Sequence, residues 1–455
     1  MVSDSAYDID KLLAKAQKPS EDAMRLHPFY RGKMQTALKC PVRDLQDFSI
    51  WYTPGVAAPC KAIQSRPELV YEMTNKGNTI AVVSDGTRVL GLGDIGPAAA
   101  MPVMEGKALL FKYLGGVDAV PICLDTKDAE EIIHAVKLLA PSFGGINLED
   151  LSQPKCFRIL DTLRAEMDIP VWHDDQQGTA TIILAGFINA VEVVGKKLTN
   201  LRIVVMGSGA ANIATTRLLL AYGVQPGQLI VVDSKGILHK GRRDIEAVRD
   251  EYVDKWHLCQ VTNAEDRRGP AEEAFRGADA VIALAHPGPG TIQPAWVRSM
   301  AKDPIVFACA NPVPEIWPWE AEAAGAKVVA TGRSDFPNQV NNSLVFPAVF
   351  RGALDVRAKT ISDEMCLAAA VELADMARQK GLSATHIVPT MDEEEVFVRE
   401  AVAVGMKAQE QGIARRTISR QELEKGARET IHAAHRLTEL MMRERLIAPT
   451  PADPA

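Results

Sequence analysis

The segment 201–233 constrains the fold of this chain more than any other part of the sequence. Residues 201–206 are predicted to form a strand, residues 210–221 a helix, and residues 229–233 a second strand that ends at Asp233. A strand, a helix and a strand in this order make a βαβ unit, in which the two strands are parallel. The sequence therefore predicts an α/β protein with a parallel sheet in this region.

Further apolar runs extend this sheet. Residues 280–284, 305–308 and 327–330 are short and apolar and lie between helical segments. Strands that alternate with helices are typical of a doubly wound sheet, whose ligand lies at the carboxyl ends of the strands. We expect a Rossmann-like domain here, with its binding site near the end of the first strand.

The first half of the chain repeats the alternation. Strands are predicted at 79–84, 117–124 and 170–172, with helices at 105–113, 129–139 and 156–166. Beyond Phe346 the sequence is helical, and Ser419 with Glu422 has the form of a capping box. A chain of 455 residues has room for two or three domains. We predict an α/β domain for substrate and metal over residues 1–172, the Rossmann-like domain over 173–342, and a helical C-terminal extension over 343–455, packed on the substrate domain or on a partner subunit.

Charge and cysteine usage exclude several classes of protein. With 51 Lys plus Arg against 58 Asp plus Glu, the formal charge is −7, which argues against nucleic acid as a ligand. The seven cysteines form no Cys-x-x-Cys pair, and no basic and apolar leader opens the chain. The longest uncharged stretch, 280–297, is interrupted by prolines and glycines, so it is no membrane span. A soluble protein of the reducing cytoplasm is expected.

Two glycine segments resemble a dinucleotide-binding turn. The literal G-x-G-x-x-G at residues 91–96 follows only a very short apolar pair, and Pro97 stands where a helix would have to begin. The second segment follows a six-residue strand and opens a helix; its residues are Gly207, Ser208, Gly209, Ala210, Ala211 and Asn212. Glycines there permit a tight turn and close approach of the backbone to a pyrophosphate at the helix N-terminus. We therefore predict that this second segment binds NAD or NADP.

The residues after the second strand leave the choice of dinucleotide open. Asp233 is placed to accept hydrogen bonds from the adenosine ribose, as in NAD-binding proteins. The neighbouring Ser234 and Lys235, with Arg242 and Arg243 close behind, suit the 2′-phosphate of NADP. The sequence does not separate the two.

Adjacent acids at two junctions between predicted elements suggest a metal site. Glu149 and Asp150 form one pair, and Asp174 and Asp175 form the other. Carboxylates that converge without cysteine ligands favour a hard divalent ion, Mg²⁺ or Mn²⁺. His173, taken alone, is expected to be structural or to support a ligand.

Together these segments resemble one family, the malic enzymes in their compact bacterial and archaeal form. The resemblance is carried, in the family's order, by seven stretches: 51–57 (WYTPGVA), 84–96 (SDGTRVLGLGDIG), 102–107 (PVMEGK), 144–150 (GGINLED), 173–180 (HDDQQGTA), 310–312 (ANP) and 337–342 (PNQVNN). It implies oxidative decarboxylation of (S)-malate to pyruvate and CO₂ with NAD⁺ or NADP⁺ and a divalent cation. A homodimer or higher homo-oligomer is expected for such an enzyme.

The resemblance also assigns roles. It implies that Tyr52 is the general acid and Lys107 the general base, with Asp174 beside Lys107. It implies Glu149, Asp150 and Asp175 as metal ligands, and Arg88, Asn311 and Asn342 as residues that contact malate, Asn311 also contacting the nicotinamide. A lysine base requires a lowered pKa, which burial and nearby cations are expected to provide.

Two departures and two other functions stay open. Gln177 stands where the family usually has a second histidine, and Asn212 replaces a small residue of the nucleotide turn. A malolactic conversion, with the cofactor retained and lactate released, is one alternative. A non-catalytic dinucleotide sensor is the other, although it predicts the loss of Tyr52, Lys107 or a metal carboxylate, and none is missing.

Overall fold

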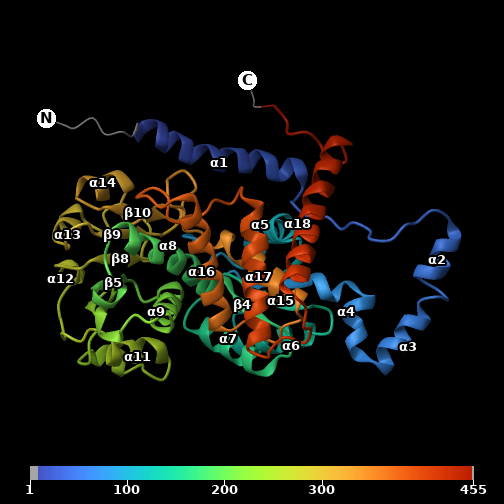
Figure 1. The fold of residues 1–455 in the computed structure, drawn as a ribbon, viewed down its shortest axis with the longest axis horizontal. Helices are drawn as coiled ribbons and strands as arrows, with labels where there is room; N and C mark the ends of the chain where they lie inside the picture. Colours follow the sequence, from blue (N-terminus) through green and yellow to red (C-terminus); the bar gives the residue numbers. More distant parts are fainter. Residues whose placement is uncertain (1–8, 453–455) are drawn as a thin grey trace.

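The computed structural model describes residues 9–452, which contain two separate sheets. Figure 1 shows them side by side, with the second sheet and its helices on the left. The first sheet has the order β2-β1-β3-β4, and all its pairs are parallel. Its strands are β1 (Thr79–Ser84), β2 (Asp118–Cys123), β3 (Gly145–Leu148) and β4 (Val171–His173). The predicted α/β fold is confirmed, although β3 is absent from the sequence-based prediction.

Both faces of the first sheet are covered by helices. These are α5 (Pro97–Gly115) on one face, and α6 (Ala129–Leu139) with α7 (Lys155–Glu166) on the other. Ile80 and Val82 of β1 lie in one apolar cluster with Phe111 of α5, whereas Ala81 and Val83 lie in another with α6 and α7. Successive strand residues point to opposite faces, so a strand between two helical layers must be apolar throughout. This explains the unbroken Ile-Ala-Val-Val run of β1.

The second sheet has the order β10-β9-β8-β5-β6-β7, with only β7 antiparallel. Its strands are β5 (Ile203–Met206), β6 (Leu229–Asp233), β7 (Gly236–Ile237), β8 (Ala280–Ala283), β9 (Ile305–Ala308) and β10 (Val328–Thr331). Its helices are α9 (Ala210–Tyr222), α10 (Arg243–Glu246), α11 (Val253–Val261), α12 (Ala271–Phe275), α13 (Pro294–Arg298) and α14 (Pro318–Ala323). The chain leaves β5 toward β6 on one side and later returns to β8 on the other. The carboxyl ends of β5 and β8 therefore form the crevice in which doubly wound sheets bind ligands.

Helices from the middle and the end of the chain join the two halves. The buried α8 (Thr179–Val193) contacts both α9 and α16. The C-terminal helices are α15 (Phe346–Asp355), α16 (Asp363–Lys380), α17 (Glu394–Glu410) and α18 (Arg420–Arg443), and α15, α17 and α18 contact α5 of the first half. The capping box of α18 is confirmed, since Ser419 and Glu422 each accept a hydrogen bond from the other's backbone N–H.

The N-terminal segment forms a long helix and then leaves the body of the protein. Helix α1 (Ile9–Tyr30) crosses the top of the molecule in Figure 1, and α2 (Leu45–Trp51) and α3 (Ala57–Ser65) project at the right edge before α4 (Val70–Met73) returns. We call residues 38–56 the arm. None of the helices in residues 9–452 has the length and apolar character needed to cross a membrane.

Candidate active site

Lys107 is buried in α5 between carboxylates that follow two strands of the first sheet. Its Nζ lies 2.6 Å from Oδ2 of Asp174 and 3.0 Å from Oε1 of Glu149. Asp174 opens the short π-helical turn η3 (Asp174–Gly178) after β4, and Glu149 directly follows β3. Trp172 Nε1 donates to the other oxygen of Asp174 at 3.1 Å. Asp174 is thereby held at both oxygens, and it fixes the lysine nitrogen.

The pKa of Lys107 is shifted in the direction opposite to the one expected from the sequence. Burial lowers the pKa of the ammonium, but the negative charges of Asp174, Glu149 and Asp175 outweigh burial and raise the pKa above its ordinary value. With the protein groups alone and no cation bound, the prediction of a lowered pKa for Lys107 is therefore wrong. The expected lowering of the Lys107 pKa also depended on a nearby cation, whose charge would offset these carboxylates.

Three carboxylates converge next to Lys107. Glu149, Asp150 and Asp175 each offer an oxygen, and these oxygens lie within 4.8 Å of one another. Asp150 N donates to Oδ2 of Asp175 at 2.9 Å, and Asp150 takes a left-handed backbone conformation, with φ of 55°. Such backbone conformations are costly for a non-glycine residue and occur often at functional sites. The predicted metal ligands thus come together from the ends of β3 and β4.

The charges of this cluster fit a divalent cation. Burial, and then the neighbouring Asp175, raises the pKa of Asp150 to about 8, and burial raises the pKa of Glu149. Asp150 Oδ2 is buried and has no hydrogen-bond partner among the described residues. An all-oxygen donor set with an unpaired buried acceptor suits Mg²⁺ or Mn²⁺. A cation at this point would remove the repulsion that raises both pKa values.

Two further residues support the cluster. His173 is buried, its Nδ1 lies 3.7 Å from Asp175 Oδ2, and burial lowers its pKa, which favours the neutral ring. Phe346, at the start of α15, lies with its ring centroid 4.2 Å from Lys107 Nζ. No local pattern marks Phe346 in the sequence, because it reaches the site only through the packing of α15 on α5.

Gln177, the departure in the His-Asp-Asp segment, has a structural contact. Its Oε1 accepts from the backbone N of His173 at 3.1 Å. Its Nε2 donates to Sγ of Cys366 in α16 at 4.0 Å, so the side chain connects the turn that carries Asp174 and Asp175 with β4 and α16.

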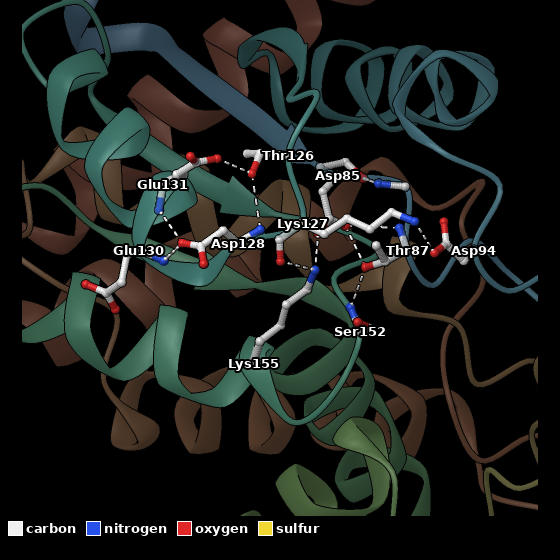
Figure 2. Close-up of polar contacts among 12 residues, drawn as sticks. Asp85, Thr87, Asp94, Thr126, Lys127, Asp128, Glu130, Glu131, Ser152 and Lys155 are labelled. Atoms are coloured by element: carbon white, nitrogen blue, oxygen red, sulfur yellow. Dashed lines mark hydrogen bonds and ion pairs between the residues drawn. The ribbon is translucent and has the colours of Figure 1, made fainter. Parts of the chain in front are cut away.

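The loop that carries Arg88 is tied to the metal-ligand loop (Figure 2). Oδ1 of the buried Asp85 accepts from both N and Oγ1 of Thr87, and Oδ2 accepts from Lys155 Nζ at 2.5 Å. Thr87 Oγ1 accepts in turn from Ser152 N at 2.9 Å. Arg88 N donates to Asp150 O at 3.0 Å, and the exposed side chain donates from Nη1 to Leu90 O at 3.3 Å. The backbone of Arg88 is therefore anchored to the loop that carries the predicted metal ligands.

The glycine segment 91–96 is a loop, as its context suggested, but one expectation about it is wrong. Helix α5 does begin at Pro97, because proline is favoured at the first helical position, where its missing N–H is not needed. Gly91 lies against the second half of the molecule: a Cβ there would stand 3.0 Å from Asn311 O and 3.6 Å from Pro287 Cγ. This glycine allows the Arg88 loop to touch the loops after β8 and β9.

The second glycine segment forms the predicted turn between β5 and α9. Gly207 has φ of 108°, a conformation that other residues rarely adopt, and Gly209 is the N-cap of α9. Ser208, Ala210 and Ala211 are half-buried around the start of that helix. Asn212 is buried, and its Nδ2 donates to Met206 O at 2.8 Å and to Leu284 O at 3.2 Å. The departure at Asn212 is thus a bridge between the carboxyl ends of β5 and β8, at the crevice.

Asp233, at the end of β6, is part of a dense ion-pair cluster. Both its oxygens accept from Arg242, at 2.9 and 2.8 Å, and Lys255 Nζ lies 2.8 Å from Oδ2. Burial opposes ionisation, but these donors lower the pKa of Asp233 overall. Lys235 Nζ lies 3.2 Å from Asp244, and Ser234 is exposed beside it. Lys235 and Arg242, which the sequence suggested as partners of a 2′-phosphate, are therefore already paired with carboxylates. Arg243, the third such cation, pairs with Glu246.

Asn311 and Asn342 lie on two sides of the junction between the halves. Asn311 is exposed just after β9, with its side chain against Gly332. Asn342 opens the short turn η6 (Asn342–Leu344), which contacts η3. Asn311 therefore lies against the Arg88 loop, and Asn342 lies beside the turn that carries Asp174 and Asp175.

Among the predicted site residues, Tyr52 lies apart from the others within a single chain. It is the C-cap of α2 on the arm and is 72% exposed. Figure 1 shows α2 at the far edge of the molecule, away from α5 and β4. Within this single chain, Tyr52 does not meet Lys107.

Comparisons with family models, curated relatives and solved structures agree with one another. Two family models match: "Malic enzyme, NAD binding domain" over residues 176–409, and "Malic enzyme, N-terminal domain" over residues 31–132 and 126–164. An NAD-dependent malic enzyme of Geobacillus stearothermophilus is 51% identical over 385 residues, covering 85% of this chain and 78% of that protein. A bifunctional malic/malolactic enzyme of Bacillus subtilis is 48% identical, covering 89% and 96%. The crystal structure of a malic enzyme from Entamoeba histolytica superposes with a TM-score of 0.94 at 45% identity, covering 98% and 93%.

Proposed function

This chain belongs to the malic enzyme family, and we propose from that premise that it oxidises and decarboxylates (S)-malate to pyruvate and CO₂ with reduction of NAD⁺. The observation that carries the proposal is Lys107 Nζ within 3.0 Å of both Asp174 and Glu149, beside three convergent carboxylates. A buried lysine in such a setting is equipped to move a proton. The adjoining crevice at β5 and β8 suits the dinucleotide.

Lys107 is the proposed base for the C2 hydroxyl of malate. The dinucleotide supplies the acceptor for the C2 hydride. Asp174 orients the lysine nitrogen, and Phe346 covers it, which keeps water from the ammonium. Because the facing carboxylates favour the protonated lysine, Lys107 can accept a proton only while their charge is compensated.

Glu149, Asp150 and Asp175 are the proposed holders of that compensating charge. Mg²⁺ or Mn²⁺ bound by these oxygens would supply a Lewis acid that polarises the C2 oxygen for oxidation and for loss of CO₂. Arg88, fixed next to Asp150 by its backbone, is proposed to bind a carboxylate of malate, for which the guanidinium fork is well shaped. Asn311 and Asn342 are proposed to contact the substrate from the other side, and Asn311 the nicotinamide as well.

The ion pairs around Asp233 support a preference for NAD⁺ over NADP⁺. The turn formed by Gly207, Ser208, Gly209, Ala210, Ala211 and Asn212 is proposed to hold the pyrophosphate, and Asp233, Ser234 and Lys235 the adenosine ribose. A 2′-phosphate would bring negative charge to Asp233 and would have to displace existing ion pairs, which costs binding free energy. We therefore expect a higher kcat/KM with NAD⁺ than with NADP⁺.

Tyr52 is proposed to protonate C3 at the site of a second copy of the chain. The arm exposes six large apolar side chains: Leu38, Val42, Leu45, Phe48, Ile50 and Trp51. Leu90 and Leu92, on the Arg88 loop next to the carboxylates, are also exposed, at 57% and 69%. Apolar groups on both surfaces favour contact between copies. An arm of one subunit that covers the Arg88 loop of the other would complete the site, so we propose a homodimer.

We also propose how the chain is divided into domains and where in the cell the enzyme is located. We propose a division into residues 1–172, 173–342 and 343–455; the presence of two sheets and a C-terminal helical segment supports it, although the first boundary falls within β4 (Val171–His173). The seven cysteines form no disulfide, which supports the cytoplasm as the location of the enzyme.

Product analysis tests the proposed reaction and separates it from the two alternatives. Protein is incubated with (S)-malate, Mn²⁺ and either dinucleotide, and pyruvate, lactate and reduced dinucleotide are measured. Oxidative decarboxylation predicts equal amounts of pyruvate and reduced dinucleotide. Lactate without net reduction would mean malolactic conversion, and binding of dinucleotide without any product would mean a sensor.

A further inference from the structure

Glu315 is a fully buried carboxylate whose two oxygens hold two different loops. Oε1 accepts from the backbone N of Ala285 at 2.7 Å, and Oε2 accepts from the backbone N of Ala310 at 3.1 Å. Its relative exposure is 0%, and neither oxygen has an ion-pair partner among the described residues. The carboxylate of Glu315 therefore accepts hydrogen bonds only from backbone amides.

The two amides belong to the loops that border the dinucleotide crevice. Ala285 follows β8 and opens the loop 285–290, and Ala310 follows β9 and precedes Asn311. The backbone adds to the same junction, since Ile292 N donates to Glu315 O and Gly288 N donates to Val313 O. One side chain thus fixes the spacing between the ends of two neighbouring parallel strands.

These loops also meet the substrate side of the site. A Cβ built on Gly91, near the tip of the Arg88 loop, would lie 3.0 Å from Asn311 O and 3.6 Å from Pro287 Cγ. Asn311 follows one of the amides that Glu315 holds, and Pro287 lies in the loop opened by the other. The position of the Arg88 loop relative to the crevice therefore depends on the two loops that Glu315 joins.

A neutral side chain would form this junction less well. Burial of a carboxylate without a cation costs free energy, and burial raises the pKa of Glu315 to about 7. A glutamine offers one good acceptor, and its amide nitrogen would face a backbone N–H, two donors pointing at each other. Only the carboxylate accepts from both loops at once.

We propose that Glu315 is a positioning residue that holds the loops 285–290 and 310–312 together so that the nicotinamide and malate C2 face each other. The residue acts through the loops and touches neither reactant. The proposal rests on the proposed dinucleotide-dependent function, and its first test is binding, which requires no turnover.

The main test compares Glu315→Gln with wild type by titration of NADH, followed by its fluorescence, in the absence of malate. Loss of one charge-assisted hydrogen bond predicts a Kd about tenfold higher. The KM for NAD⁺ should rise in parallel, and the deuterium isotope effect with C2-deuterated malate should increase. Glu320→Gln is the matched control, because Glu320 caps the following helix α14 and holds neither loop.

The outcomes separate this proposal from the reaction itself. A folded Glu315→Gln variant with wild-type Kd for NADH would overturn the positioning role, whatever the reaction. Normal NADH binding by wild type without malate oxidation would overturn the proposed reaction and leave the Kd comparison valid. If Glu315→Gln does not fold, hydrogen exchange on wild type decides: NADH must slow exchange in the segments 284–291 and 309–315, and an unchanged rate contradicts the proposal.

Discussion

Lys107 is the residue on which the proposed chemistry depends most directly. It contacts Asp174 and Glu149, residues from two other segments of the chain, and its ammonium lies against the ring of Phe346. A lysine held in this way has a defined position and a perturbed proton affinity. Its removal should slow the chemical step and leave dinucleotide binding intact.

Lys107→Met should lower kcat at least about 10²-fold, the usual loss when a general base is removed. The Kd for NADH should stay within about twofold of wild type, because Lys107 does not border the glycine turn. Lys112→Met is the control, since Lys112 lies on the same helix but pairs with Asp118. A folded Lys107→Met enzyme that retains more than about a tenth of kcat would contradict the assignment.

Most of the catalytic cluster could be predicted from sequence, and the physical setting of its members could not. The two acidic pairs stand at junctions between predicted elements, and the family resemblance assigned their members, although β3, which Glu149 and Asp150 follow, was not predicted. The pKa direction of Lys107 and the presence of Phe346 depend on packing between distant segments, which no local pattern encodes. Tyr52 illustrates the same limit, since its motif is recognisable but the chain carries it away from the site.

Asn212 gives a second prediction at this scale. Asn212→Gly supplies the third glycine of the usual fingerprint, yet it removes the bridge from Nδ2 to Met206 O and Leu284 O. We expect the Kd for NADH to rise about fivefold, in line with the loss of buried hydrogen bonds. Ala211→Gly controls for added backbone freedom. Tighter binding by Asn212→Gly would show that the bridge does not support the turn.

Among the helices and strands, the long apolar elements could be predicted from the sequence. Strand β1 and the two strands of the βαβ unit, β5 and β6, contain unbroken apolar runs. Such runs are typical of parallel strands that are buried on both faces. Strand β3 is four residues, Gly-Ile-Asn-Leu, and its central place in the sheet follows from its neighbours β1 and β4. The projection of α2 and α3 has no sequence signal either, and α2 exposes large apolar side chains that a single chain does not cover.

Helix α17 carries a buried acid that makes the stability of the fold depend on pH. Glu400 is 0% exposed, and neither of its oxygens has a partner among the described residues. Burial, and then the charge of Glu372, raises the pKa of Glu400 well above its ordinary value. An acid whose pKa is higher in the folded state than in the unfolded state destabilises the fold as pH rises above the unfolded value of about 4.3.

Glu400→Gln should therefore have a larger free energy of unfolding than wild type at about pH 7, by about 1–3 kcal/mol. The difference should shrink toward about pH 4, where both states of wild type bind the proton. Urea unfolding at a series of pH values measures it, with the exposed Glu410→Gln on the same helix as the control. A difference that does not change with pH would contradict the role of ionisation.

At the scale of the whole molecule, the central question is where Tyr52 acts. The two halves meet at the Arg88 loop and the loops after β8 and β9, whereas the arm extends away from them (Figure 1). If two copies exchange arms, each site combines Lys107 of one chain with Tyr52 of the other. The arrangement can be tested without a structure of the dimer.

Mixed dimers of Tyr52→Phe and Lys107→Met chains, isolated with two affinity tags, should recover about half of wild-type activity, because one of their two sites is intact. Mixed dimers of wild type with the double variant should be almost inactive, since each site then lacks one group. If Tyr52 acts within its own chain, the two results are reversed, and the exchange of arms is wrong.

In the proposed reaction, the C2 hydride of malate passes at the Lys107 site to a dinucleotide that leaves the enzyme reduced. Malate with deuterium at C2 tests this claim most directly, with Mn²⁺ and NAD⁺ present. We predict deuterium in the released NADH, an equal amount of pyruvate, and formation of both at least about 10²-fold more slowly with Lys107→Met. Deuterium retained at C2 of lactate, or no transfer of the label at all, would contradict the account.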